Sequence, residues 1–370
     1  MLVVRPVRIE DLDALFRLAE SAGIGLTTLP PDRRLLRERI VRSQHALAAD
    51  PLKPGGETYL FVLEDLRTGA LAGTAGMVAK VGGFEPFYSY QLRTTVHESA
   101  EMGVRKEIRT LHLVANHSGP SEIGTLFLSS THRGGGNGRL LSLSRFLFMA
   151  DFPHRFDEEV IAEMRGVLTP DGNSPFWDTV GRHFFDMEFA RADVLSAADK
   201  QFIADLMPKH PIYIPMLPPD VQAVIGQVHV ETRPALRLLE QEGFVFGAHV
   251  DIFDAGPLVS APRDRIRTLA QSVRAVVRDI VPEIGLPETY LISNGRVEFR
   301  ACLGHLRPVG PGGGPEGASH ESVGRQPGGA LHESVGRQPG GGQVDVPRDI
   351  ALALGLRVGD TLRYAPARAG

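Results

Sequence analysis

Four glycines gather between Arg133 and Gly138, in a run that reads Arg-Gly-Gly-Gly-Asn-Gly. Glycine adopts positive φ angles without strain and lets the backbone approach a ligand closely. Successive N–H groups in such a turn, together with the N-terminus of a following helix, form a concave set of donors that suits phosphate oxygens. The run therefore predicts a site for an anionic cofactor. The alternative interpretation is a simple turn after a strand.

The run differs from the common nucleotide-binding loops. Arg139 and Leu140 follow where a P-loop needs Gly-Lys-Ser/Thr, and the dinucleotide spacing is absent. Arg133, Gly136 and Gly138 instead match R-x-x-G-x-G, which resembles the pyrophosphate loop of the GNAT superfamily of N-acyltransferases. The residues that this resemblance assigns to acyl-coenzyme A (acyl-CoA) are Arg133, Gly134, Gly135, Gly136, Asn137 and Gly138.

Apolar patterning places the loop between a strand and a helix. Glu122–Leu128 reads as a strand that enters the loop, and Arg139–Ala150 carries the broad apolar stripe of a helix. Upstream, Leu2–Val7 predicts a strand that is followed by a helix closed at Gly23. Between these parts, residues 59–63 and 71–78 flank a polar turn, as in an antiparallel hairpin, and a further short strand is predicted at 110–114.

A second block has a similar order of strand, loop and helix. It opens with the apolar run Val160–Val167, and Pro175–Phe185 is predicted as one helix with Pro175 in its first turn. Val224–Val230 reads as a strand, after which a helix opens at Thr232-Arg233-Pro234 and ends at Gly243. Phe244–Phe253 reads as another strand. This order suggests a weak internal duplication, although no residue-level repeat supports it.

Near the C-terminus, glycine and proline dominate one long segment. Pro308–Gln343 holds 12 glycines and 5 prolines in 36 positions, which is typical of a flexible loop. Within it the run His320–Gly329 recurs from His332, and these two histidines on a mobile chain would make a poor metal site. Beyond it, strands at 343–346 and 361–364 are predicted around a helix at 348–355.

These elements predict an α+β fold, with a GNAT-like mixed and mainly antiparallel sheet flanked by helices. Three units are expected. Residues 1–155 form an N-terminal acyl-CoA-binding domain and residues 156–258 a second GNAT-like α/β domain. Residues 259–370 form a small β-rich part that contains the disordered Gly/Pro-rich repeat loop 308–342.

Many separate runs resemble the arginine N-succinyltransferase family in the family's order, over about residues 1–305 and more faintly over 343–365. The runs are Gly25–Pro30, Phe61–Asp65, Thr125–Leu128, Gly136–Gly138, Ala162–Gly166, Ser174–Trp177, Met207–Tyr213, Ile225–His229 and Asp251–Asp254. The sequence departs from the family in the repeat-bearing loop, which is inserted between two predicted strands of the C-terminal part.

The resemblance implies transfer of the succinyl group of succinyl-CoA to the α-amino group of L-arginine, giving N2-succinyl-L-arginine and CoA in arginine catabolism. The family's proton donor falls on His229 and its acyl-CoA contact on Leu126, with Leu128 on the same strand. An extended pantetheine could bond the backbone at Leu126 as an added strand would. His229 closes an apolar run before a helix start, where it could give a proton to the departing thiolate.

Other residues compete for these roles. A histidine that closes an apolar run is often structural, and His210 is the rival catalytic histidine, whereas histidines 112, 183 and 249 are interpreted as structural. Asp251, Asp254 and Glu163 are candidate partners for the guanidinium of arginine, but paired acids near a turn are usually solvated, so these contacts stay unassigned. Lone Trp177 is interpreted as core.

Composition narrows the function further. The 40 Lys+Arg and 44 Asp+Glu give a formal net charge of -4, so neither nucleic acid nor a membrane surface is an expected partner. No signal peptide or membrane span is recognised, and the single cysteine, Cys302, fits a reducing cytoplasm and a buried strand position. A covalent acyl-enzyme on Cys302 is not expected, because no motif there suggests an activated thiolate. No metal is expected.

Three hypotheses remain. The first is the arginine succinyltransferase, working as a homo-oligomer or with a paralogous subunit. The second is the same chemistry on ornithine or another cationic amine, or with another acyl-CoA. The third is a non-catalytic acyl-CoA or arginine sensor, against which the glycine loop together with His229 argues.

Overall fold

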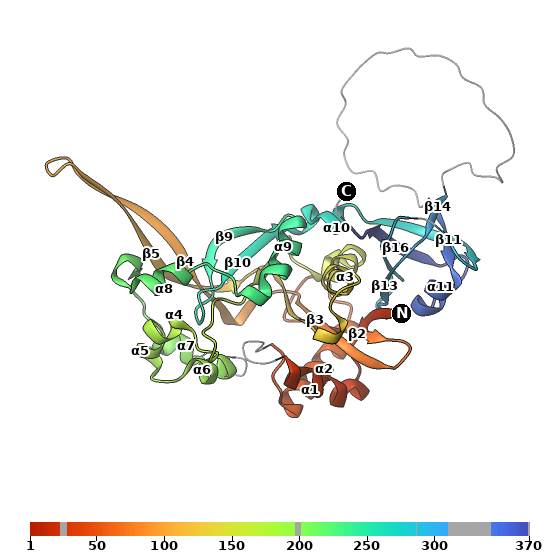
Figure 1. The fold of residues 1–370 in the computed structure, drawn as a ribbon, viewed down its shortest axis with the longest axis horizontal. Helices are drawn as coiled ribbons and strands as arrows, with labels where there is room; N and C mark the ends of the chain where they lie inside the picture. The colour runs from red at the N-terminus through yellow and green to blue at the C-terminus, as the bar shows by residue number, and fades with distance from the viewer. Residues whose placement is uncertain (23–27, 197–200, 286, 310–341, 369–370) are drawn as a thin grey trace, which may run out of the picture.

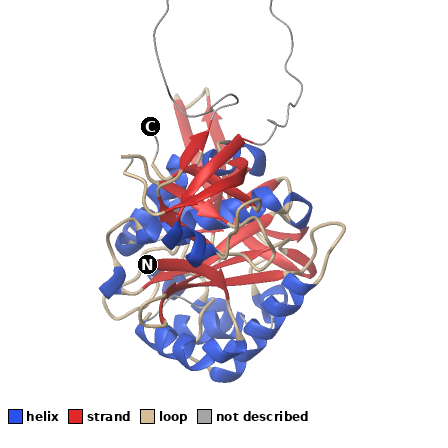
Figure 2. Cartoon of the chain, turned by 90° about the vertical axis from the view of Figure 1, so that its right-hand side faces the viewer, coloured by secondary structure: helices blue, strands red, loops and turns tan. Residues whose placement is uncertain are grey.

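The computed structural model describes residues 1–22, 28–196, 201–285, 287–309 and 342–368. Within these residues sixteen strands form one sheet, with the order β14-β15-β11-β16-β12-β13-β1-β2-β3-β6-β7-β10-β9-β4-β5-β8. Only the pairs β6–β7 and β11–β15 are parallel among the described strands. In Figure 2 the strands run through the middle of the molecule and the helices lie outside them. The predicted mixed, mainly antiparallel sheet is confirmed.

The centre of the sheet comes from the first half of the chain. Its strands are β1 (Leu2–Pro6), β2 (Thr58–Asp65), β3 (Ala70–Val78), β6 (Ser121–Leu128) and β7 (Glu159–Glu163). The hairpin predicted at 59–78 is confirmed as the antiparallel pair β2–β3. Gly23, the predicted end of the first helix, lies outside the described residues, as does the first half, residues 25–27, of the family-like run at 25–30.

Helices cover both faces of this centre. Helices α1 (Leu12–Ser21) and α2 (Arg33–Ala48) lie on one face, and α3 (Asn137–Asp151) lies on the other (Figure 1). Successive side chains of β2 point to opposite faces of the sheet, and both sets are apolar. Tyr59 and Phe61 join the cluster that contains α3, whereas Leu60 packs with the apolar side chains of α1 and α2. Strands β2, β3 and β6 therefore have a distinct environment on each face.

Strands β4 (Gly82–Ser99) and β5 (Val104–Ser118) form a long antiparallel arm that projects from the body (Figure 1). At its base β4 pairs with β9 and β5 pairs with β8. The short strand predicted at 110–114 is part of this much longer element. Beyond the base, the two strands pair only with each other among the described strands.

In its described residues, the middle of the chain adds six small helices and three more strands. They are α4 (Pro175–Thr179), α5 (Arg182–Phe185), α6 (Phe189–Ser196), α7 (Gln201–Leu206), β8 (Ile212–Tyr213), α8 (Pro219–Val224), α9 (Arg233–Gln241), β9 (Val245–Val250) and β10 (Pro257–Pro262). Trp177 is fully buried in their core, as predicted.

Two predictions in this region are wrong. The single helix expected at Pro175–Phe185 is broken between α4 and α5 at Gly181, which packs so closely on the Trp177 indole that a Cβ there would lie 2.2 Å from the ring. The strand expected at Val224–Val230 is also absent. Helix α8 extends to Val224, and Gly226 then turns the chain at a φ of 75°. Within this run only Val228 forms a β-bridge, to Gly166.

The C-terminal part completes the other end of the sheet. Its elements are α10 (Arg267–Ala270), β11 (Val273–Val281), β12 (Tyr290–Ser293), β13 (Ala301–Gly304), β14 (Arg307–Val309), β15 (Gly342–Pro347), α11 (Arg348–Leu354) and β16 (Thr361–Pro366). Its final strands and helix are as predicted. The repeat and its two histidines lie outside the described residues, but Pro308 and Gly342 belong to strands, so the predicted loop 308–342 is too long at both ends.

The three predicted units remain a prediction, since residues from each contribute strands to the one sheet. No helix in the described part of the chain is long and apolar enough to cross a membrane.

Candidate functional site

The glycine run forms a tight loop between β6 and α3, through the 3-10 turn η2 (Ser130–His132). Gly134, Gly135 and Gly136 have φ angles of 110°, 58° and 82°, and Gly136 is the left-handed N-cap of α3. Asn137 stabilises the loop, because its amide Nδ2 donates to the carbonyl of His132 at 2.9 Å. The predicted strand, loop and helix order is confirmed, and the N-terminus of α3 opens from this loop.

The glycines differ in what a side chain would meet. A Cβ at Gly134 would meet nothing within 4 Å, so that position needs glycine only for its backbone angle. At Gly136 it would lie 2.9 Å from Cδ1 of Leu303 on β13. Gly138 lies inside α3 without a positive φ and its Cβ would meet only Leu128, at 3.8 Å. Positive φ therefore explains Gly136 but not Gly138.

Strand β6 is distorted just before the loop. Gly76 pairs with Gly124 and Thr74 pairs with Phe127, so two residues of β6 lie opposite one residue of β3. Thr125 takes a φ of 50°, which is uncommon for a threonine. This bulge shifts the alternation of side chains. Ile123 and, beyond the bulge, Leu126 and Leu128 therefore pack against the same cluster, on the α3 face.

A buried arginine of α3 supports the bulge from below. Arg145 is 2% exposed, and its Nη1 donates to the carbonyls of Gly76 and Gly124, both at 3.3 Å. Its remaining bonds go to the carbonyl and the hydroxyl of Ser142. Burial lowers the pKa of Arg145 to about 9. From the neighbouring strand β3, the Thr74 hydroxyl donates to the carbonyl of Thr125 at 2.9 Å. The side chains of Arg145 and Thr74 therefore hold the bulge in place.

The sheet opens beside the bulge. Strands β6 and β7 run parallel, but they pair only at Ser121–Val160 and Glu122–Ile161. Past Glu122 the backbone of β6 therefore has no ladder partner on the β7 side among the described strands. An extended ligand chain could add there in the manner of a strand. Leu126 and Leu128 lie on this segment with their side chains against the core.

His229 lies beyond the end of β7. Its backbone N–H donates to the carbonyl of Arg165 at 2.8 Å, and it caps the 3-10 turn η5 (Val230–Thr232) rather than ending the predicted strand. Its Nδ1 accepts from the N–H of Glu231 at 3.3 Å, so the neutral ring carries its proton on Nε2. Burial, and then the nearby Arg165, lower the pKa of His229 below its usual 6.5, whereas Glu231 acts in the opposite direction.

The topology relates His229 to the glycine loop. The loop follows the carboxyl end of β6, and the Arg165–Gly166 segment that holds His229 follows the carboxyl end of β7. Because parallel neighbours end at the same edge of a sheet, both features lie at the edge where the two strands separate.

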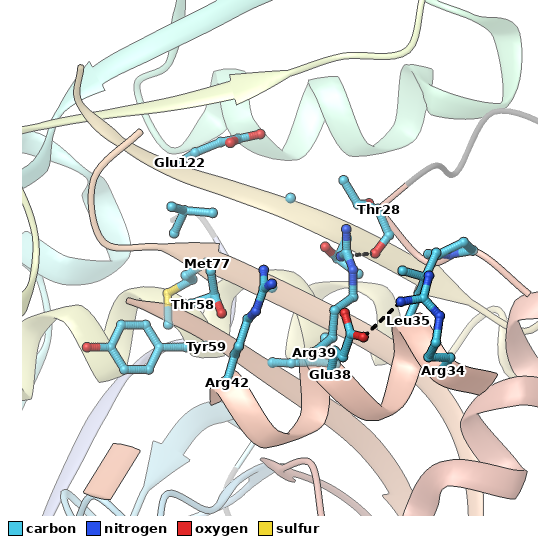
Figure 3. Close-up of a pocket in the computed structure, with 16 residues that line it drawn as sticks. Thr28, Arg34, Leu35, Glu38, Arg39, Arg42, Thr58, Tyr59, Met77 and Glu122 are labelled. Atoms are coloured by element: carbon cyan, nitrogen blue, oxygen red, sulfur yellow. Dashed lines mark hydrogen bonds and ion pairs between the residues drawn. The ribbon is translucent and has the colours of Figure 1, made fainter. Parts of the chain in front are cut away.

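A cavity of about 480 Å³ lies on the opposite face of β6, under helix α2 (Figure 3). Gly124 and Thr125 of the bulge form part of its wall, as does Glu122. Other walls come from β2 and β3, and helix α2 contributes Arg34, Leu35, Glu38, Arg39 and Arg42.

The cavity is strongly charged. Arg34 pairs with Glu38 at 3.1 Å, whereas Arg39 donates to the backbone carbonyl of Thr28. Burial, followed by the nearby Arg42, lowers the pKa of Arg39, and Glu122 acts in the opposite direction. No local sequence pattern assigns a role to the residues that line this cavity. The one sequence feature that could have indicated the cavity is Glu122, a charged residue near the start of a mainly apolar strand that leads to the glycine loop.

The residues that the sequence offered as alternative site residues make other contacts or lie at the surface. Asp251 accepts from the N–H groups of Phe253 and Asp254 at 2.7 and 2.9 Å, and Asp254 accepts from those of Gly166 and Gly256 at 2.7 and 2.8 Å. Both aspartates therefore hold backbone turns. His210 is exposed.

The remaining residues on which the sequence left alternatives are structural in their contacts. His112 and His249 bond the hydroxyls of Thr110 and Ser89 at 3.0 Å. Cys302 is fully buried in β13, and burial raises the pKa of its thiol to about 12, which opposes thiolate chemistry. Across the described ranges, no group of three or more His, Cys, Asp or Glu side chains could hold a metal ion.

Comparison with known proteins identifies the family. A family model described as arginine N-succinyltransferase beta subunit matches residues 2–268. The chain belongs to the arginine N-succinyltransferase family. An arginine N-succinyltransferase of Enterobacter sp. (strain 638) is 46% identical over 311 residues, which cover 84% of this chain and 90% of the relative. The arginine N-succinyltransferase subunit beta of Pseudomonas aeruginosa is 45% identical over 302 residues, or 80% of this chain and 87% of that protein.

A solved structure from the same family extends the comparison to the whole fold. It is described as arginine/ornithine succinyltransferase subunit AI from Pseudomonas aeruginosa. Its TM-score is 0.82 at 33% identity, and the match covers 100% of this chain and 99% of that chain. The predicted arginine N-succinyltransferase family and its acyltransferase α+β fold are thereby confirmed, and the chain is an acyltransferase of this family.

Proposed function

We propose that this chain transfers the succinyl group of succinyl-CoA to the α-amino group of L-arginine, and so produces N2-succinyl-L-arginine and CoA in arginine catabolism. The observation that carries the proposal is the family membership over residues 2–268. The loop, the bulge and the charged cavity support the proposal, because they suit a phosphate-bearing cofactor, a thioester and charged substrate groups.

Succinyl-CoA is proposed to bind along the carboxyl half of β6. Its pyrophosphate would accept from the N–H groups of the Arg133–Gly138 loop and the N-terminus of α3. Its pantetheine would follow the backbone of Leu126 and Leu128, where β6 has no ladder partner on the β7 side. This path brings the thioester to the bulge at Thr125, between the opening and the cavity.

The reaction is proposed as direct attack. The unprotonated α-amine of arginine forms a C–N bond to the thioester carbonyl carbon, and the C–S bond then breaks with its electron pair on sulfur. Protonated His229, the imidazolium form, gives the proton on Nε2 to that sulfur, becomes neutral and regains a proton from solvent, while the proton that the amine loses goes to solvent. Glu122 lies on the cavity wall by the bulge and is proposed to attract the cationic acceptor.

The chain is also proposed to work in an assembly, as a homo-oligomer or with a paralogous subunit. The β4–β5 arm supports this, because an isolated two-stranded hairpin is only marginally stable in water. Near its tip Val96, Met102 and Val104 are 45%, 77% and 39% exposed. The names of two relatives include a subunit designation. Light scattering on the intact chain and on a variant with the arm shortened to its base would test the arm, since an unchanged mass would contradict its role.

The cytoplasm is proposed as the location of the chain, with the buried free Cys302 as support.

A thiol-release assay tests the activity. Succinyl-CoA and acetyl-CoA are each combined with arginine, ornithine and lysine. The proposal expects the highest kcat/KM for succinyl-CoA with arginine, and mass spectrometry should locate the succinyl group on the α-nitrogen. Ornithine is the second candidate acceptor, because the name of the solved relative includes ornithine. Binding of acyl-CoA without any turnover would favour the sensor instead.

A further inference from the structure

The cavity under α2 holds more positive charge than its own acids balance. Three guanidinium groups and two carboxylates line it. Arg34 and Glu38 neutralise each other at 3.1 Å, which leaves Arg39 and Arg42 against Glu122 alone. Arg42 forms no hydrogen bond or ion pair with any other described residue. Two neighbouring cations that face a cavity with a single acid favour an anionic ligand.

The two arginines are arranged to act together. Arg39 and Arg42 are three residues apart on α2, so their side chains leave the helix on the same face. Both extend from the helix toward the strand that carries Glu122 (Figure 3). Arg39 is half-buried, and Arg42 lies at the exposed side of the cavity. A guanidinium is a planar fork of donors that matches the two oxygens of a carboxylate.

Helix α2 is firmly positioned on the sheet. Asp32 caps its N-terminus and accepts from the N–H groups of Arg34 and Leu35 at 2.8 and 2.9 Å. Farther along the helix, the Ser43 hydroxyl accepts from the N–H of Leu60 at 2.8 Å. Leu36 and Ile40 are fully buried against the same strand region. The arginines therefore stand on a fixed support, which reduces the cost of ordering them around a ligand.

The position of the cavity specifies which carboxylate it suits. Its wall includes Gly124 and Thr125, at the bulge where the proposed function locates the thioester. In a succinyl group two methylene carbons separate the thioester carbonyl from the free carboxylate. A succinyl chain that leaves the bulge on the α2 side therefore enters the cavity with its carboxylate leading. An acetyl group has no distal carboxylate for the arginines to bind.

We propose that Arg39 and Arg42 bind the distal carboxylate of the succinyl group and so set the preference for succinyl-CoA over uncharged acyl-CoA. This inference rests on the proposed function. The other carboxylate that enters the site is the α-carboxylate of arginine, and the test separates the two.

The experiment crosses two donors with two acceptors. Succinyl-CoA is compared with butyryl-CoA, which has the same chain length and no carboxylate. L-Arginine is compared with L-argininamide, which keeps the α-amine and loses the carboxylate. The chain is tested as wild type, Arg42→Gln and Arg39→Gln. Arg37→Gln is the matched control, because Arg37 is an exposed arginine of α2 outside the cavity.

Arg42→Gln is expected to lower kcat/KM for succinyl-CoA by about 10–100-fold, the range for a lost charge-assisted hydrogen bond. Its kcat/KM for butyryl-CoA should stay within about twofold of wild type, and Arg37→Gln should change neither value. The succinyl/butyryl ratio should fall equally with arginine and argininamide. Arg39→Gln should act in the same direction, and circular dichroism checks that both variants are folded.

Two results would overturn the inference. In one, the succinyl/butyryl ratio survives in both variants. In the other, the arginine/argininamide ratio collapses instead, which would assign the arginines to the acceptor. A wild-type chain that transfers no succinyl group to arginine contradicts the proposed function. Calorimetric titration then still decides the inference, because wild type should bind succinyl-CoA more tightly than butyryl-CoA and Arg42→Gln should remove that difference.

Discussion

The glycine loop follows the carboxyl end of β6 and the α2 cavity lies on one face of the same strand, but they are built differently. The loop comes from six consecutive residues, Arg133–Gly138, and works through its backbone. The cavity is lined by side chains of α2, β2, β3 and β6, from Thr28 to Thr125. A cofactor that many enzymes share can be bound by a short backbone motif. Recognition of one acyl group and one acceptor needs side chains from distant segments.

The largest expected effect comes from a residue outside both regions. His229→Gln should lower kcat by about 10²–10⁴-fold, because it removes the proton that the sulfur takes up. Affinity for CoA should be unchanged, since His229 touches neither the loop nor the cavity wall in the described structure. Steady-state kinetics and calorimetry measure the two quantities. His210→Gln is the control, and the assignment is wrong if the control loses activity while His229→Gln keeps it.

The pH profile sharpens that assignment. Transfer needs protonated His229 and an unprotonated amine, so kcat/KM should be level between the pKa of His229 and that of the amine. The lowered pKa of His229 places the acid limit of this plateau below pH 6.5. In His229→Gln only the free amine matters, so kcat/KM should rise about tenfold per pH unit up to the pKa of the amine. Identical profiles for the two proteins would count against His229.

The loop is expected to contribute equally to the affinity for CoA and for each acyl-CoA, whatever the acyl group. Gly138→Val should weaken CoA, succinyl-CoA and butyryl-CoA alike, by about 10–100-fold, because a side chain at the phosphate site removes charge-assisted hydrogen bonds. Its free energy of unfolding should change little, since its Cβ meets only Leu128. Calorimetric titration measures the affinities. A loss confined to succinyl-CoA would break the proposed division between loop and cavity.

Gly136→Val provides the matched comparison. It should weaken CoA binding as well, but it should also lower the free energy of unfolding by roughly 1–3 kcal/mol. Its φ of 82° is strained for a β-branched residue, and its Cβ would meet Leu303 at 2.9 Å. Urea unfolding separates the two variants, and equal stability would show that the loop relaxes freely.

Arg145 connects the two regions, because it lies under the bulge that borders both. Arg145→Met should remove the donor that Arg145 supplies to the carbonyls of Gly76 and Gly124, and lower the free energy of unfolding by roughly 1–3 kcal/mol. Arg145→Lys retains a donor and should lose less. Urea unfolding with kinetics on both variants tests this, and a Met variant of wild-type stability and activity would mean that the bulge needs no support.

The smallest effect is expected from the segment between β14 and β15. Replacing residues 310–341 with a short Gly/Ser turn should leave turnover within about twofold, because the cost of closing a loop varies slowly with its length. Val309 and Gln343 are Cα partners in the β14–β15 pair, so a short turn can join them. The replacement must spare Pro308 and Gly342. A large loss of activity would give the segment a role in the reaction.

Local patterns predicted the elements around the loop well. The alternation in β2–β3 and the apolar stripe of α3 are properties of short segments, so they could be recognised from the sequence. Val224–Val230 was misassigned because apolar residues alone do not distinguish a strand from a turn fixed by Gly226. Helix α2 was not predicted, because its arginines surround a narrow apolar stripe of Leu36 and Ile40.

Tertiary structure decides the rest of the site. The bulge at Thr125 depends on a buried guanidinium twenty residues later in the chain, and Glu122 becomes part of a cavity only when α2 covers it. The position of His229 depends on Arg165, which is distant in sequence. The family resemblance singled out His229, whereas no local pattern singles out Arg39 or Arg42.

A crystal structure with an unreactive succinyl-CoA analogue, in which CH2 replaces the thioester sulfur, tests the account most directly. Pyrophosphate oxygens are expected within hydrogen-bond distance of the N–H groups of the Arg133–Gly138 loop, and the distal carboxylate is expected between Arg39 and Arg42. The acyl carbonyl should lie at the bulge of Thr125. A pyrophosphate bound away from the loop, or a succinyl chain that turns away from α2, would contradict it.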